Sequence, residues 1–208
     1  TTATATRWTV SIARSGKWSS VVTSSARVPL TNVELANRLA YFLWAGPPDE
    51  RLMSYVEAGR LGDKGILSSG YINEVDRMLA DARSNRFIDD FVRQWLQLHR
   101  VGAFPPDASL YPDYDKWLER SMVLETTSYF ETMFRENRSL REFLSSDWTM
   151  LNSRLAMHYG LDLQRNAQQA GASNNGGFEK FALRADDHRG GLLTQASILS
   201  LTTDGTRH

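Results

Sequence analysis

Residues 187–208 concentrate polar side chains that could bind a ligand around one short apolar run. Arg189-Gly190-Gly191 leads into this run, and a glycine-rich entry into a helix presents free N–H groups that, with an arginine, hold an anion or a carboxylate. The alternative, which we favour, is a tight turn that lets the last helix pack closely, with Arg189 paired to an Asp or Glu. The ligand-binding candidates are Arg189, Gly190, Gly191 and Arg207.

The four histidines lie far apart in the sequence, without the His-x-x-x-His or His-x-x-Glu-His spacing of a local metal site. His188 and His208 flank the terminal run, and His158 falls at the predicted end of a helix, where it would interact with the helix dipole. We therefore predict no metal site, with His158, His188 and His208 as weak candidates. The absence of cysteine excludes thiolate ligands and covalent haem attachment, so we expect no cofactor within this chain.

Two charged residues lie at positions where helical periodicity predicts burial. Glu125 falls within an apolar stripe on a long predicted helix, and Arg38 falls within the stripe formed by Leu35, Leu39 and Phe42. A buried charge needs a partner, so we expect Glu125 and Arg38 to pair with each other or with other opposite charges. We favour an ion pair that fixes helix register over a catalytic role, which makes Glu125 and Arg38 the catalytic candidates of the alternative.

The elements that must position these residues are mainly helices. Periodic apolar residues and capping signals predict helices over 31–44, 49–59, 69–82, 85–98, 115–137, 140–144 and 153–159, and a short strand over 178–183. Alternation around Ser15-Gly16 predicts a small N-terminal β-hairpin. The sequence thus predicts a mainly α fold, a multi-helix bundle with a short N-terminal β-hairpin and a little strand near the C-terminus.

Composition narrows the partners. The 24 basic residues balance the 24 acidic residues, so no overall positive charge predicts nucleic-acid binding. No apolar run approaches the roughly 20 residues that a membrane-spanning helix needs. We expect neither a nucleic-acid partner nor a membrane span.

Three ordered motifs carry a family resemblance. They are the segment from Val33 to Trp44, the segment from Phe91 to Leu96, and Leu151-Asn152-Ser153-Arg154-Leu155-Ala156-Met157-His158-Tyr159-Gly160 leading on to Arg189-Gly190-Gly191-Leu192-Leu193-Thr194-Gln195. Over residues 30–208 the chain resembles planctomycetal exported proteins that carry a pair of adjacent uncharacterised domains, often beside cytochrome c-like domains.

The resemblance implies a domain organisation and a location. We expect an N-terminal hairpin or extension over 1–30, a helical domain over 31–163, a flexible loop over 164–177, and over 178–208 the start of a second family domain, truncated at His208. It also implies a periplasmic or secreted protein, partnered by the remainder of its polypeptide or by a cytochrome c-like domain. Any haem would lie on that other domain or chain.

Two functions follow as expectations. In the first, the chain is a helical module of an extracytoplasmic, cytochrome-associated protein, a scaffold or substrate-binding part of an electron-transfer or oxidative system. In the second, it is a stand-alone extracellular enzyme that acts on a polymer or a small substrate through a buried carboxylate. A closed interior around Glu125 would favour the first, and a pocket that opens onto Glu125 would favour the second.

Overall fold

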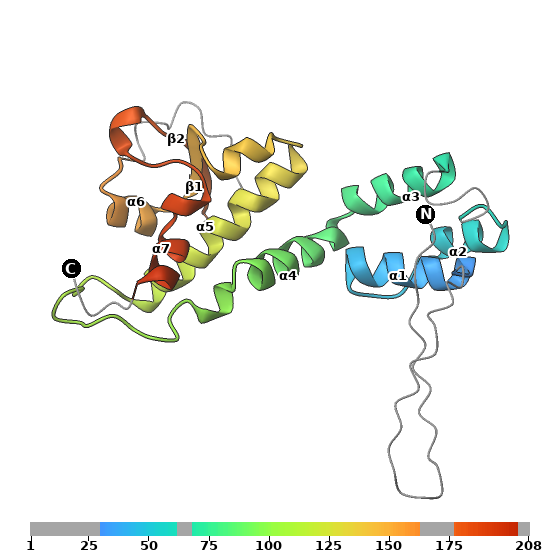
Figure 1. The fold of residues 1–208 in the computed structure, drawn as a ribbon, viewed down its shortest axis with the longest axis horizontal. Helices are drawn as coiled ribbons and strands as arrows, with labels where there is room; N and C mark the ends of the chain where they lie inside the picture. The colour runs from blue at the N-terminus through green and yellow to red at the C-terminus, as the bar shows by residue number, and fades with distance from the viewer. Residues whose placement is uncertain (1–29, 62–67, 163–176, 204–208) are drawn as a thin grey trace, which may run out of the picture. The chain divides into compact units, whose positions relative to one another are not determined.

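The computed structural model describes residues 30–61, 68–162 and 177–203, which form two compact units, one within 1–87 and the other within 88–208 (Figure 1). These residues confirm the mainly α fold, with seven α-helices and one pair of antiparallel strands. The predicted N-terminal hairpin and nearly all of the predicted 164–177 loop lie outside the described residues. None of the described helices is both long and apolar enough to cross a membrane.

The first unit contains α1 (Asn32–Trp44), α2 (Glu50–Glu57), α3 (Ser69–Ala80) and the short 3-10 helix η1 (Ala82–Ser84). Its core includes Trp44, whose indole N–H donates to the carbonyl oxygen of Met78 at 3.0 Å. The Arg83 guanidinium lies 3.4 Å from the centroid of the Trp44 ring and covers it. Trp44 therefore joins the end of α1 to α3 with both its apolar ring and its polar edge satisfied.

The bounds predicted for α1, 31–44, are confirmed, with Thr31 as the N-cap and Trp44 as the last helical residue. The Thr31 hydroxyl accepts from the Glu34 N–H while the Glu34 carboxylate accepts from the Thr31 N–H, which is the expected capping box. The glycine that follows this helix, Gly46, would be the expected left-handed cap, but the left-handed residue is Ala45, with φ of 49°. The ring of Pro47 disfavours helical backbone at Gly46, the residue before it, so the left-handed residue is Ala45.

The second unit is built around α5 (Lys116–Arg135). The N-terminal part of this unit holds most of α4 (Asn85–Trp95) and η2 (Leu98–Arg100). After α5 come η3 (Leu140–Phe143), β1 (Trp148–Leu151), α6 (Ser153–Tyr159), β2 (Glu179–Ala182), η5 (Ala185–Asp187), η6 (Leu192–Thr194) and α7 (Ala196–Thr202). Strand β2 confirms the short strand predicted near the C-terminus. Strand β1 was not predicted.

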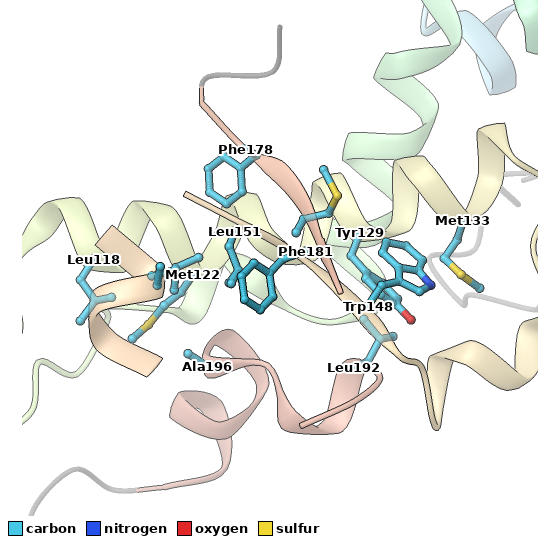
Figure 2. Close-up of a cluster of buried hydrophobic side chains, with 13 residues drawn as sticks. Leu118, Met122, Tyr129, Met133, Trp148, Leu151, Phe178, Phe181, Leu192 and Ala196 are labelled. Carbon is cyan, nitrogen blue, oxygen red and sulfur yellow. The ribbon is translucent and has the colours of Figure 1, made fainter. Parts of the chain in front are cut away.

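Strands β1 and β2 pair antiparallel, with Trp148 opposite Ala182 and Leu151 opposite Glu179. Side chains from α5, the two strands and the segment 192–196 converge in a single apolar cluster (Figure 2). Tyr129 stacks on Trp148 with ring centroids 4.3 Å apart. Residues after 177 are therefore part of the same core as α5 and β1.

Trp95 lies at the edge of the core of the second unit. The α4 helix buries Ile88 and Val92, whereas Trp95 is 50% exposed and lies beside the rings of Phe130 and Phe143 at its edge. The apolar stripe on α4 is wider than its buried face, so its aromatic members line the surface.

Candidate functional site

Glu125 lies at the centre of the second unit, on the buried face of α5, and is 1% exposed. The predicted burial of Glu125 is therefore confirmed. Its carboxylate accepts a hydrogen bond from each of two hydroxyls, Thr149 Oγ1 to Oε1 at 2.9 Å and Tyr159 Oη to Oε2 at 2.6 Å. Thr149 lies on β1, and Tyr159 is the last residue of α6. Three separate elements thus position one buried carboxyl group.

Burial raises the pKa of Glu125 to about 7, because the low-dielectric interior disfavours the charged carboxylate. The hydrogen bonds from Tyr159 and Thr149 and the positive charge of Arg189 oppose this shift. Near neutral pH the group therefore exchanges between its protonated and ionised forms, which is the range required of a general acid or base.

Tyr159 connects Glu125 to the last segment of the described chain. Its hydroxyl donates to Glu125 and accepts from the backbone N–H of Ala196 at 2.9 Å. Burial and the neighbouring Glu125 charge raise the pKa of Tyr159, so the phenol stays neutral. The guanidinium of Arg189 lies 3.5 Å from the centroid of the Tyr159 ring and donates to the carbonyl oxygen of Thr194 at 2.8 Å. Arg189 is thus held between a ring face and a backbone carbonyl.

The turn at Gly190-Gly191 already uses its own N–H groups. Gly190 donates to Thr194 Oγ1 at 2.9 Å, and Gly191 donates to Ser146 Oγ at 3.0 Å. Gly191 has φ of 72°, and a Cβ placed on it would lie 2.7 Å from backbone atoms of Phe143 and Leu144. These contacts favour a tight, closely packed turn over an anion-binding loop.

A pocket of about 280 Å³ opens on the other side of Tyr159, within the same unit. Three side chains that carry or can carry positive charge line it, together with aromatic and aliphatic walls; these lining residues include Arg100, His158, Arg189, Phe104, Tyr111, Tyr114, Tyr159, Met122 and Leu199. Glu125 does not line this pocket. It lines instead a cavity of about 10 Å³ beside Arg189 and Gly190, close to the volume that one water molecule requires.

His158 lines the pocket in a positive environment. Burial lowers the pKa of His158, and the charges of Arg154 and Arg189 lower it further, against the opposing effect of Asp113. Arg154 is itself buried, donates to Asp115 Oδ2 at 3.2 Å and also donates to the Asp113 carbonyl oxygen. His158 does lie in the last turn of α6, as predicted. Burial and these two positive charges favour the neutral form of His158.

The remaining predicted site residues do not gather around Glu125. Arg38 lies on the exposed face of α1 in the first unit, so its predicted burial is wrong, and hydroxyls rather than Arg38 bond the Glu125 carboxylate. His188 is exposed, while Arg207 and His208 lie outside the described residues. Across 30–61, 68–162 and 177–203, no group of three or more His, Cys, Asp or Glu side chains could hold a metal ion.

Sequence reasoning did not identify Thr149, Tyr159 or Arg100 as functional residues. Tyr159 could have been identified from the sequence, because it follows His158 in the motif that ends at Gly160. Thr149 carried no such signal, since it lies on the strand that was not predicted. Residues 151–160 and 189–195, which carry part of the family resemblance, contact each other through Tyr159 and Arg189.

The model of a family described as PSD4, protein of unknown function (DUF1592), matches residues 30–161. Searches of curated proteins and of solved structures found no match.

Proposed function

The chain belongs to the DUF1592 family, and from that premise we propose that it is the ligand-binding module of a larger extracytoplasmic protein. The observation that carries this proposal is the pocket of about 280 Å³ beside Tyr159, walled by rings and by positively charged groups. Concave, largely apolar sites with a few fixed polar groups are the usual form of small-molecule sites. The contact of Arg189 with the Tyr159 ring and with the Thr194 carbonyl oxygen fixes one of those polar groups before any ligand arrives.

The proposal includes the setting that the family resemblance implies. The protein would be of planctomycetal origin and act outside the cytoplasm, and a cytochrome c-like domain on the same or another polypeptide would receive or supply electrons. The module would then hold the substrate while the haem domain exchanges electrons with it. The full-length protein should be recovered from the extracytoplasmic fraction together with covalently bound haem, which haem staining of a denaturing gel detects.

Binding is tested by a ligand-observed NMR screen of small molecules against the purified chain. Leu199 lines the pocket and is 45% exposed, so Leu199→Trp should fill the pocket and abolish the binding of most hits. Leu193→Trp is the matched control, because Leu193 is 62% exposed and does not line the pocket. A screen without hits, or hits that both variants retain equally, would overturn the proposal.

The second function is an enzyme that uses Glu125 as an acid or base. It is favoured by the 2.6 Å hydrogen bond that joins the buried Glu125 carboxyl group, with its pKa of about 7, to Tyr159, which lines the pocket. It requires Tyr159 to relay a proton or to move, because Glu125 is sealed from the pocket. Glu125→Gln should remove any turnover of a ligand identified in the screen while leaving its binding intact. Unchanged turnover in that variant would exclude Glu125 as the catalytic group.

A further inference from the structure

The proposed binding pocket also indicates what kind of molecule it accepts. Resting on the proposed function, we propose that its ligand is a small carboxylate attached to an apolar, ring-sized body, with the carboxylate bound at Arg189 and the body against Phe104, Tyr111 and Leu199. Charge, anchoring and wall chemistry each support this assignment.

The charge of the pocket is one-sided. Among the residues of the described ranges that line it, Arg100 and Arg189 are cations, His158 can become one, and none is Asp or Glu. The carboxylate of Glu119 does not line the pocket and accepts hydrogen bonds from Lys116 and Tyr114. A ligand that brings one negative charge would complete this pocket, whereas an amine would be repelled.

Arg189 is the better placed of the two guanidinium groups to bind the carboxylate. Among the described residues, the Arg189 guanidinium contacts the Tyr159 ring face and donates from one nitrogen to the Thr194 carbonyl oxygen. These contacts leave further N–H groups of its planar fork for an acceptor. An arginine fixed in this way loses little side-chain entropy when it binds a carboxylate in bidentate geometry. Arg100 is exposed and bonded to Gln97, so it contributes mainly charge.

The walls limit the rest of the ligand. Phe104, Tyr111 and Tyr114 supply rings, and Met122, Leu199 and Leu201 supply aliphatic surface. A cavity of about 150 Å³ binds benzene in another protein, so a pocket of about 280 Å³ has room for one ring with a short substituent. Ser200 and Thr203 also line the pocket, so a sugar or a peptide would find few partners there for its several hydroxyl or amide groups.

The test compares three probes of nearly equal shape, phenylacetate, 2-phenylethanol and 2-phenylethylamine, by calorimetric titration of the wild-type chain. Phenylacetate should bind at least about 10-fold more tightly than the alcohol, and the amine should not bind, because a charge-assisted bidentate bond is present only with the acid. Arg189→Gln should remove the preference while the alcohol still binds. Arg189→Lys, which keeps the charge and loses the fork, should retain only part of it.

The outcomes separate this inference from the proposed function. Equal binding of acid and alcohol to the wild type would overturn the ligand class and leave the binding module standing. Binding of none of the probes, together with an NMR screen that finds no other pocket ligand, would overturn both. If Arg189→Gln does not fold, as judged by near-ultraviolet circular dichroism, two other measurements test whether positive charge causes the preference for the acid. They are the affinities of Arg100→Gln and the salt dependence of phenylacetate binding to the wild type. A preference that neither Arg100→Gln nor salt weakens would overturn the inference. Tighter binding of phenylphosphonate than of phenylacetate would replace the carboxylate by a phosphonate or phosphate.

Discussion

The raised pKa of Glu125 should make the second unit less stable as the pH rises and this carboxyl group ionises. Its carboxyl group has an ordinary pKa of 4.5 in the unfolded chain and about 7 in the folded protein. Well below pH 4.5 the carboxyl group is protonated in both states, so a change of pH there does not alter its contribution to the unfolding free energy. Between pH 4.5 and 7 the unfolded state releases its proton first and is favoured, so stability falls with rising pH and levels off above 7.

The size of the effect follows from the two pKa values. A shift from 4.5 to about 7 corresponds to a total loss of roughly 3 kcal/mol, of which about 2.5 kcal/mol falls between pH 5 and pH 8. Glu125→Gln keeps the shape of the protonated side chain and cannot ionise. The unfolding free energy of the wild type, measured relative to that of Glu125→Gln, should therefore decrease by about 2.5 kcal/mol from pH 5 to pH 8.

The assay is urea unfolding at pH 5, 6, 7 and 8, followed by near-ultraviolet circular dichroism, which reports the packed Trp148 and Tyr129 pair. Asp186→Asn is the matched control, because it replaces an exposed carboxylate of the same unit by an amide of the same shape. The control should follow the wild type at every pH. A wild type that runs parallel to Glu125→Gln from pH 5 to pH 8 would refute the assignment of a raised pKa to this group.

Four further substitutions test the surroundings of the site: Gly191→Ala, Gly160→Ala and Asn152→Ala are measured by urea unfolding, and Tyr159→Phe is measured by NMR. Gly191→Ala should cost more than about 2 kcal/mol, because its Cβ would overlap backbone atoms and its φ is positive, whereas Gly160→Ala, with a similar φ and open space, should cost about 1 kcal/mol; equal costs would contradict the close packing. Tyr159→Phe removes a bond that lowers the pKa of Glu125, so that pKa, followed by carboxyl carbon NMR, should rise above its wild-type value; an unchanged or lower value would show that the hydroxyl does not bond the carboxylate. Asn152→Ala should cost about 1–2 kcal/mol, because it removes the cap of α6 and a buried bond to α5; a loss below about 0.5 kcal/mol would mean that the cap contributes little.

The starts of α1 and α2 and the end of α6 were predictable because their signals are local. The capping box at Thr31, the Asp49 cap of α2 and the glycine that ends α6 each depend on a few neighbouring residues. The burial of Glu125 was predictable for the same reason, since its stripe on α5 is regular. Strand β1 was not, because all four of its residues are buried and the alternation that marks a half-buried strand is absent.

The partner of Glu125 and the exposure of Arg38 could not be predicted from spacing. Thr149 and Tyr159 come from elements that meet α5 only in the folded core, 24 and 34 residues further along the chain. On α1 the buried face contains Ala36 and Ala40, and the 63% exposed Phe42 belongs to its edge. The prediction placed the buried face by the large apolar residues, which include Phe42 at its edge. The small side chains of Ala36 and Ala40 allow close packing and mark the face that is actually buried.

The shared core of the second unit has a consequence for synthesis on the ribosome. Phe178, Phe181, Leu192 and Ala196 fill space against α5 and β1, so those earlier elements leave the ribosome before the residues that cover them. Until then Leu118, Met122 and Tyr129 are exposed to water and to other nascent chains. A chaperone that binds extended apolar segments would bind the nascent chain mainly during this interval. A chain that stopped at residue 161, where the family match ends, would never leave it.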